Sequence, residues 1–346
     1  MIRSTQLSRD SEISLVPEMM HPLNVAKRLS GCYSTPSSGA PQCAAVRKPT
    51  LIMRPFVFVG CVLGDVARRL YQTNTYEVLG GLPEPTFVVC GCHNPSALEF
   101  FRFHPNGRNL VVCDLGHIYM EFMRGPKMDG GEVNRRLFAL CGLTEVQQLT
   151  KARQPEPLGY FHAPDVITSK GHVVLHPFGR GWGDWPPETC EVVRAALRAV
   201  PPSIRVFVVS ADYVSTDGRT KVESFPCDLP NVTVLKNLSA PAAFTLVATA
   251  SRFIGTMSAL AQVAAFENTP SVILHPARCS DFKPPYSNYS KTIWNANGVA
   301  VPYDSIAKTS LEGALVRFLD KPDSALKMRE DFRDVDPGPT ADAIRT

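Results

Sequence analysis

The sequence predicts an α/β protein with two Rossmann-like domains, each built on a parallel sheet, that face a cleft between them. Three observations predict this fold. Short apolar runs alternate with helix-like segments along most of the chain, as in parallel sheets covered by helices. A proline-bearing segment at 151–165 interrupts the alternation, which then restarts. The length of 346 residues accommodates two domains of ordinary size.

Four segments follow from this pattern. Residues 1–49 are rich in Ser, Pro and Gly and are expected to form an N-terminal extension, partly disordered or draped over the first domain. Residues 50–155 are expected to form the first domain, and residues 156–335 are expected to form the second. Residues 336–346 form a polar tail.

In the first domain, strands are expected where apolar residues run together, and helices where apolar residues recur at helical spacing. The expected strands are 51–59, 86–90 and 109–113. The expected helices are 65–71, 95–103, 116–123 and 132–140. Regular structure is therefore expected to begin at Leu51.

The second domain repeats the alternation. Strands are expected at 172–175, 204–209, 231–234, 253–254 and 271–274, separated by helical patterns that include 189–200 and 311–319. Ligands of such sheets bind beyond the carboxyl ends of the strands, so the turns at those ends are the places to seek a site.

Composition and charge describe an ordinary globular protein. The net charge of +4 is too small to indicate nucleic-acid binding, although a local basic cleft stays open. No run approaches the roughly 18 apolar residues of a membrane span. The N-terminus also lacks the charged-then-apolar order of a secretory signal. We therefore expect a cytoplasmic protein without a membrane span.

The ten cysteines are scattered between Cys32 and Cys279 and lack paired metal spacing. Cys90-Gly91-Cys92 is a C-x-C sequence, and no second pair answers it. We therefore expect no metal site. Cys61 and Cys113 lie in or beside apolar runs, where free thiols behave as small hydrophobes, which favours a reducing compartment.

One turn stands out, at 176–188. The apolar run before it, the glycines within it and the Pro-Pro-Glu helix start after it predict a strand, a tight turn and a helix N-terminus. Such a turn can cradle phosphate with main-chain N–H groups and the positive end of the helix, and Arg180 can add a charged fork. The alternative is an ordinary strand-to-helix turn in which Gly and Pro only set the geometry. Neither the dinucleotide fingerprint nor the P-loop motif is present.

Several stretches resemble the ADP-heptose:lipopolysaccharide heptosyltransferases, in the same order along residues 51–320. They are Leu51-Ile52-Met53-Arg54-Pro55 with Val62-Leu63-Gly64-Asp65-Val66, the turn at 176–188, the small-residue turn and helix at 253–265, and the strand at 268–276. Three features depart from the family's pattern, and one of them is a missing Lys in the 176–188 turn, which leaves Arg180 as the nearest cation there. Met257 stands in the turn that usually carries an acidic residue, and Gln262 replaces a common His.

The resemblance implies an inverting GT-B glycosyltransferase that needs no metal and no cofactor. Its co-substrate is a nucleotide-diphosphate sugar, bound by the second domain, and the first domain binds a hydroxyl acceptor. The implied catalytic residue is Asp65. The implied donor-binding residues are His176, Gly179, Arg180, Gly181, Thr256, Met257, Ser258 and Gln262. The implied acceptor-binding residues are Gly64, Arg68, His93, Asn94 and Asp114.

Several of these residues can instead have a purely structural role, such as helix capping or packing. Asp65 can cap the following helix, and Thr256 or Ser258 can cap another. His176 can be a satisfied histidine at a strand end. Trp185 is expected to be a packing anchor rather than a platform for a base. His93, His104 and His117 are expected in or beside loops of the first domain, where they can line an acceptor pocket.

Other functions stay open. The acceptor can be a glycan, a small molecule or a modified base in DNA, the last of which requires salt-sensitive duplex binding. A catalytically silent nucleotide- or glycan-binding module would keep the same two-domain shell. A nicotinamide-dependent enzyme is disfavoured because the glycine fingerprint and an obvious ribose-binding acid are missing.

Overall fold

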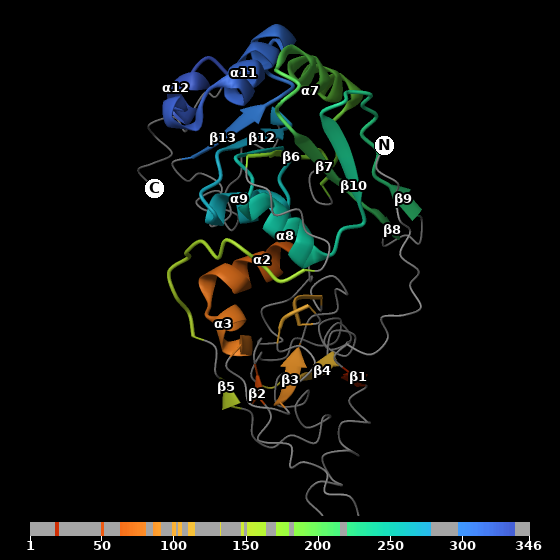
Figure 1. The fold of residues 1–346 in the computed structure, drawn as a ribbon, viewed down its shortest axis with the longest axis vertical. Coiled ribbons are helices and arrows are strands. Elements are labelled where there is room, and N and C mark those ends of the chain that lie inside the picture. The colour runs from red at the N-terminus through yellow and green to blue at the C-terminus, as the bar shows by residue number, and fades with distance from the viewer. Residues whose placement is uncertain are drawn as a thin grey trace, which may run out of the picture. The chain divides into compact units, whose positions relative to one another are not determined.

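The computed structural model describes residues 18–20, 50–51, 63–80, 86–90, 99–101, 103–105, 110–114, 132, 147–148, 151–163, 171–179, 183–214, 220–277 and 297–335. The chain divides into two compact units, Met1–Gln154 and Pro155–Thr346. Each unit is built on a parallel sheet (Figure 1).

The first unit contains a five-stranded sheet in the order β1-β4-β3-β2-β5. All of its pairings are parallel. Its strands are β1 (Glu18–Met20), β2 (Thr50–Leu51), β3 (Thr86–Cys90), β4 (Leu110–Asp114) and β5 (Gln147–Gln148). The predicted strands at 86–90 and 109–113 agree with β3 and β4 to within one residue. The predicted continuation of the first strand to residue 59 lies outside the described residues.

Regular structure begins earlier than predicted. Strand β1 lies within the segment expected to be an extension, and it pairs with β4 through the register Met19↔Val112. Part of that segment is therefore an edge strand of the first sheet. The sequence gives no sign of this strand because three residues are too few to show alternation, and their hydrogen bonds come from β4.

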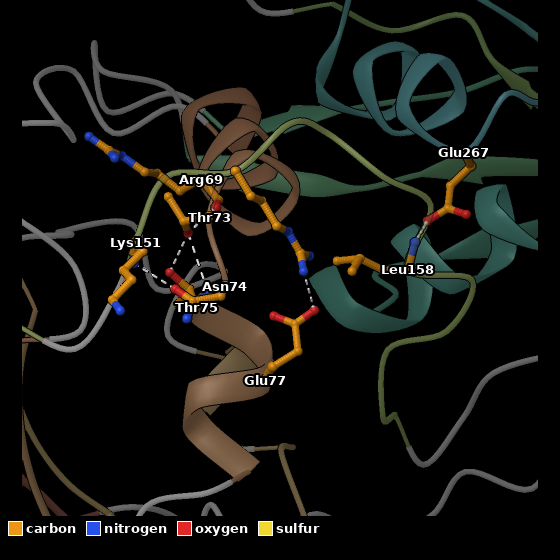
Figure 2. A network of polar contacts seen from close by, with 9 residues as sticks. Arg69, Thr73, Asn74, Thr75, Glu77, Lys151, Leu158 and Glu267 are labelled. Carbon is orange, nitrogen blue, oxygen red and sulfur yellow. Dashed lines mark hydrogen bonds and ion pairs between the residues drawn. The ribbon is translucent and has the colours of Figure 1, made fainter.

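Two short helices follow β2, namely α2 (Leu63–Gln72) and α3 (Thr75–Gly80). The buried residues of α2 are Val66, Ala67, Leu70 and Tyr71, a spacing that forms one helical face. The Thr73 hydroxyl ends α2 by donating to the Arg69 carbonyl (2.5 Å), and it also contacts the Thr75 hydroxyl (2.6 Å) (Figure 2).

The second unit contains a six-stranded parallel sheet in the order β10-β7-β6-β11-β12-β13. Its strands are β6 (Val173–His176), β7 (Val206–Ser210), β10 (Val232–Lys236), β11 (Arg252–Gly255), β12 (Ser271–His275) and β13 (Gly298–Pro302). Numbered along the chain, these strands stand in the order 3-2-1-4-5-6, which is the Rossmann order. The predicted α/β class with parallel sheets is confirmed. Strand β13 and the separate antiparallel ribbon of β8 (Asp212–Val214) and β9 (Thr220–Val222) were not predicted.

Helices cover both faces of this sheet (Figure 1). Helices α7 (Pro187–Ala199) and α11 (Lys308–Asp320) lie over one face, while α8 (Ala240–Ala248) and α9 (Ala259–Phe266) lie over the other. A 3-10 turn (Asp323–Ala325) and α12 (Met328–Asp331) follow α11. Val173 and Leu175 of β6 belong to the core formed with α7 and α11. Because side chains alternate along a strand, Val174 and His176 face α8 and α9.

The segment between the two sheets is fastened within each unit by hydrogen bonds. In the first unit, the Arg153 N–H donates to the Gln72 carbonyl (2.9 Å), and the Lys151 N–H donates to Asn74 Oδ1 (2.6 Å). In the second unit, Glu267 Oε1 accepts from the N–H groups of Leu158 (2.9 Å) and Gly159 (3.0 Å) (Figure 2). This segment, predicted as a linker, is therefore ordered at both ends.

Phe161 completes the attachment to the second unit. Its N–H donates to Thr245 Oγ1, and the same hydroxyl donates to its carbonyl, both at 2.8 Å. Its ring is fully buried and packs edge to face on Phe244, 5.7 Å between centroids. One hydroxyl of α8 therefore satisfies both main-chain groups of a buried residue.

Replacing Thr245 with Val should lower the free energy of unfolding by about 2 kcal/mol, because it leaves two buried main-chain groups unpaired. Thr245→Ser keeps the hydroxyl and should cost only about 1 kcal/mol, the burial of one methyl group. Urea unfolding followed by tryptophan fluorescence checks this, since Trp182, Trp185 and Trp294 all lie in the second unit. Equal losses in the two variants would contradict the prediction.

Candidate functional site

The strand order of the second sheet reverses between β6 and β11, and the loops that leave these two strands meet. The Thr256 N–H donates to the His176 carbonyl (3.0 Å). Gly179 also approaches Thr256 closely, since a Cβ on this glycine would lie 3.0 Å from Thr256 Cγ2 and 3.5 Å from the Met257 carbonyl oxygen. Ligands of open α/β sheets bind at such a reversal, so the fold places these predicted residues where a ligand is expected.

The turn after β6 is closed by its own hydrogen bonds. The Gly183 N–H donates to the Gly179 carbonyl (3.1 Å), and the Gly179 N–H donates to Asp184 Oδ1 (3.2 Å). Gly183 has a φ of +84°, a region that glycine adopts without strain. The Asp184 carboxylate, which was not among the predicted site residues, therefore already accepts a hydrogen bond from the Gly179 N–H, one of the main-chain groups expected to bind phosphate. Arg180 and Gly181 lie outside the described residues.

Trp185 anchors this turn, as predicted. Its side chain is 5% exposed, its indole N–H donates to the Leu274 carbonyl (3.3 Å), and its main-chain N–H donates to the Pro177 carbonyl (3.0 Å). These contacts tie the turn to the end of β12. A ring buried in this way offers no face to a base.

Helix α7 begins with few free N–H groups. Pro186 and Pro187 have none, and the N–H groups of Thr189 and Cys190 both donate to the Pro186 carbonyl (3.0 and 3.1 Å). The acidic Glu188 also lies in this first turn. The start of α7 is therefore poorly suited to an anion, which differs from our expectation for the 176–188 turn.

Helix α9, which follows β11, begins differently. Ser258 is its N-cap and accepts a hydrogen bond from the Ala261 N–H (3.3 Å), so the expected capping role falls to this residue. The first-turn residues Ala259 and Leu260 have no partner within the helix for their N–H groups, and this turn contains no acidic residue. An anion at this end is favoured by these donors and by the helix dipole.

Gln262, one turn into α9, is the most unusual side chain at this site. It is 1% exposed, and within the part of the chain that the structure describes neither its Nε2 nor its Oε1 has a hydrogen-bond partner. A buried polar group without a partner costs about 1–3 kcal/mol, so such groups call for a functional explanation. Helical side chains tilt toward the N-terminus, which places this amide over the turn that Ser258 caps.

His176 ends β6 and is partly buried. Its Nδ1 lies 3.1 Å from the Val209 carbonyl oxygen, and its ring packs edge to face on Phe178 (5.9 Å between centroids). Burial lowers the pKa of His176 to about 4, against smaller opposing effects of the Val209 carbonyl and the Asp184 carboxylate. The imidazole is therefore neutral at physiological pH.

This pKa makes stability depend on pH in a defined window. The unfolded His176 takes up a proton below about pH 6.5, whereas the folded one does so only near pH 4, so acidification between these values favours unfolding. Between pH 7 and pH 5 the free energy of unfolding of the wild type should fall by about 2 kcal/mol more than that of His176→Asn, whose side chain cannot titrate. Urea unfolding at the two pH values checks this. Equal losses would mean that His176 titrates normally when folded.

Only some of the first-unit residues that the resemblance implies lie among the described residues. Asp65 is the third residue of α2, which begins at Leu63, two residues before the predicted start, so Asp65 lies within the helix rather than before it. Gly64 is buried in the same turn, and the partly buried Arg68 follows Asp65 by three positions on one helix face. Asp114 is the last residue of β4.

Of the three histidines expected to line an acceptor pocket, only His104 lies among the described residues. His104 is 7% exposed and packs edge to face against Tyr76, with 4.9 Å between ring centroids. This ring contact agrees with a packing role for His104, and its place in an acceptor pocket stays a prediction. His93, Asn94 and His117 lie outside the described residues.

Metal and membrane features were searched over the same described ranges. No group of three or more His, Cys, Asp or Glu side chains there could hold a metal ion. None of the described helices is long and apolar enough to cross a bilayer.

Known proteins were compared with the chain. No family model matches it. A search of curated proteins likewise finds no significant match. Among solved structures, the Escherichia coli heptosyltransferase WaaC with ADP-2-deoxy-2-fluoro heptose is 14% identical, with 65% of this chain and 68% of that chain covered and a TM-score of 0.29. The iron-containing dodecameric glycosyltransferase TibC from enterotoxigenic E. coli is 15% identical, with coverages of 70% and 62% and a TM-score of 0.32.

A third solved structure, the glycotransferase of kitacinnamycin, is 12% identical over 92% of this chain and 93% of that chain, with a TM-score of 0.35. The chain thus spans about two thirds of the length of the two E. coli proteins. At these scores the likeness carries no argument about the reaction, which has to come from the site itself.

Proposed function

We propose that this protein is an inverting GT-B glycosyltransferase that moves a sugar from a nucleotide-diphosphate sugar to a hydroxyl acceptor, without a metal or other cofactor. The observation that carries the proposal is the reversal point of the second sheet. There the loops after β6 and β11 meet, the first turn of α9 has N–H groups without a partner inside the helix, and the buried amide of Gln262 has no hydrogen-bond partner among the described residues.

The start of α9 is the anion-binding part of this proposal. Its N–H groups and the adjacent Thr256 and Met257 bind the diphosphate, and the Gln262 amide completes its hydrogen bonds with the same ligand. Gly179 allows the turn after β6 to lie close to Thr256, and Arg180 and Gly181 belong to the same turn. A diphosphate, which accepts many hydrogen bonds, suits a group of main-chain donors better than a neutral ligand does.

The chemistry assigned to Asp65 is general-base catalysis. The carboxylate removes the proton of the acceptor hydroxyl, the resulting oxygen attacks the anomeric carbon, and the bond from that carbon to the diphosphate oxygen breaks. The nucleoside diphosphate leaves with its new negative charge stabilised by the amides of α9. Gly64, Arg68, His93, Asn94 and Asp114 are the proposed acceptor contacts, and a glycan or a modified DNA base is the proposed acceptor.

The first experiment is a set of melting curves with ADP, UDP, GDP, CDP and NAD. A ligand at 100 times its dissociation constant stabilises a protein by about 2.7 kcal/mol, which is a clear shift. We expect one diphosphate to give that shift. Flat curves would indicate a silent module, and a shift with NAD alone would indicate a dinucleotide enzyme.

A Gln262 variant tests whether the melting shift comes from nucleotide bound at the start of α9. Gln262→Leu replaces two unpartnered polar atoms by an apolar group of similar size, so the protein without ligand should be as stable as the wild type or more stable. The same variant should lose most of the nucleotide-induced shift. A full shift in Gln262→Leu would place the nucleotide elsewhere.

A further inference from the structure

One ring nitrogen of His176, Nε2, has no hydrogen-bond partner among the described residues at the carboxyl end of β6. A carbonyl oxygen can only accept a hydrogen bond, so the contact with Val209 requires that Nδ1 carry the hydrogen. With the ring neutral, Nε2 then has a lone pair and no hydrogen. In this state His176 can accept a hydrogen bond from a ligand but cannot offer a positive charge to phosphate.

The two described helices on the His176 face of the sheet are uncharged. Helices α8 and α9, which cover this face, contain no acidic or basic residue. The register partner of His176 on β11 is Gly255, and the place that a Gly255 side chain would take is filled by the uncharged ring of Phe253. The charged side chain that acts on the imidazole is Asp184, in the turn after β6, and a carboxylate there disfavours a second anion. A neutral group with a hydrogen to donate fits these surroundings.

We propose that His176 accepts a hydrogen bond from a hydroxyl group of the bound nucleotide sugar through Nε2, and that it does not contact the phosphates. The inference rests on the proposed function and specifies it, since it assigns the phosphates to the start of α9 and a sugar ring to the α8–α9 face beside β6. The hydroxyl belongs to the ribose or to the transferred sugar. The two sources share the same chemistry and are separated by the test below.

Two variants isolate the Nε2 lone pair. His176→Asn keeps an amide N–H that can donate to the Val209 carbonyl but has no acceptor where Nε2 stands. His176→Gln is long enough to place an amide oxygen near the position of Nε2 and so restores the acceptor. Calorimetric titrations at pH 7 would use ADP, UDP, GDP, CDP, the sugar conjugates of whichever diphosphate binds, and inorganic pyrophosphate.

The expected result is an approximately tenfold loss of affinity in His176→Asn, partial recovery in His176→Gln, and equal pyrophosphate affinity in all three proteins. A loss already seen with the nucleoside diphosphate assigns the hydroxyl to the ribose, and a loss seen only with the sugar conjugate assigns it to the sugar. Weakened pyrophosphate binding in His176→Asn, or unchanged binding of every ligand, would overturn the inference.

Failure of the proposed function looks different, because then the wild type itself binds none of these ligands. If either variant fails to fold, nitrogen-15 spectra of the wild-type histidines replace the titrations. A bare Nε2 and a protonated Nδ1 between pH 5 and pH 8, with Nε2 shifted by the bound nucleotide, would support the inference. Protonation of both nitrogens near pH 6.5 would overturn it.

Discussion

Asp65→Asn should lower the rate of sugar transfer by about 10²–10⁴-fold, the usual contribution of a positioned general base. The amide has nearly the shape of the carboxylate but cannot take the proton of the acceptor hydroxyl. Donor binding belongs to the second unit in our proposal, so the nucleotide-induced melting shift should persist in this variant. Single-turnover assays with the donor identified by its shift would measure the loss.

The competing role for Asp65 makes a different prediction. A carboxylate in the first turn of α2 also stabilises the helix through its dipole, and neutralising it costs about 0.3–1 kcal/mol. In that case Asp65→Asn would reduce stability slightly and leave the transfer rate unchanged. Asp114→Asn serves as a matched control, because Asp114 also lies in the first unit but is proposed only to bind the acceptor.

Gly255→Ala should destabilise the second unit by about 1–3 kcal/mol, the usual cost of overpacking a core. A Cβ on this residue would lie 2.6 Å from a ring carbon of Phe253 and 3.0 Å from the His176 carbonyl oxygen. The Phe253 ring is fully buried, so it has little room to move. Because the next residue, Thr256, bonds to the same His176 carbonyl, the substitution should also weaken nucleotide binding.

Gly313→Ala is the matched control for this prediction. Gly313 lies inside α11, where a Cβ would find its nearest neighbour, Arg317, at 3.5 Å. An alanine there should stabilise the helix by about 0.5–1 kcal/mol. Chemical unfolding of the two variants should therefore shift in opposite directions. A neutral Gly255→Ala would mean that the contact between the β6 and β11 ends is loose.

The alternation of apolar runs was enough to predict most strands of the second sheet but not all of them. Strand β6 was expected at 172–175 and lies one residue later, because β-branched and apolar residues run together there. Strand β13 was missed although all five residues are buried, since its bounding Gly298 and Pro302 are typical of turns. Such a strand depends on its pairing with β12, which no local pattern records.

The candidate site was predictable to a similar degree. Thr256 and Ser258 follow an apolar run and precede a helix pattern, so their position at the sheet edge could be expected. The bond from the Gly179 amide to Asp184 and the isolation of the Gln262 amide could not, because both depend on where side chains meet after folding. The neutral state of His176 likewise depends on its burial, which outweighs the opposing effect of the Val209 carbonyl on the neighbouring strand.

The fastened linker has a consequence for any motion between the units. Hydrogen bonds of their main-chain groups, several of them to side chains, hold residues 151–153 to the first unit and 158–161 to the second, so residues 154–157 lie between the two attachments. Pro155 and Pro157 have fixed φ angles, and the residues that precede them are confined to extended conformations. Hence these four residues form a short, rigid linker about 12 Å long rather than a flexible one. Glu267, at the end of α9, bonds to Leu158 and Gly159, where this connection ends, so a force transmitted through the connection acts on the helix whose other end forms the proposed diphosphate site.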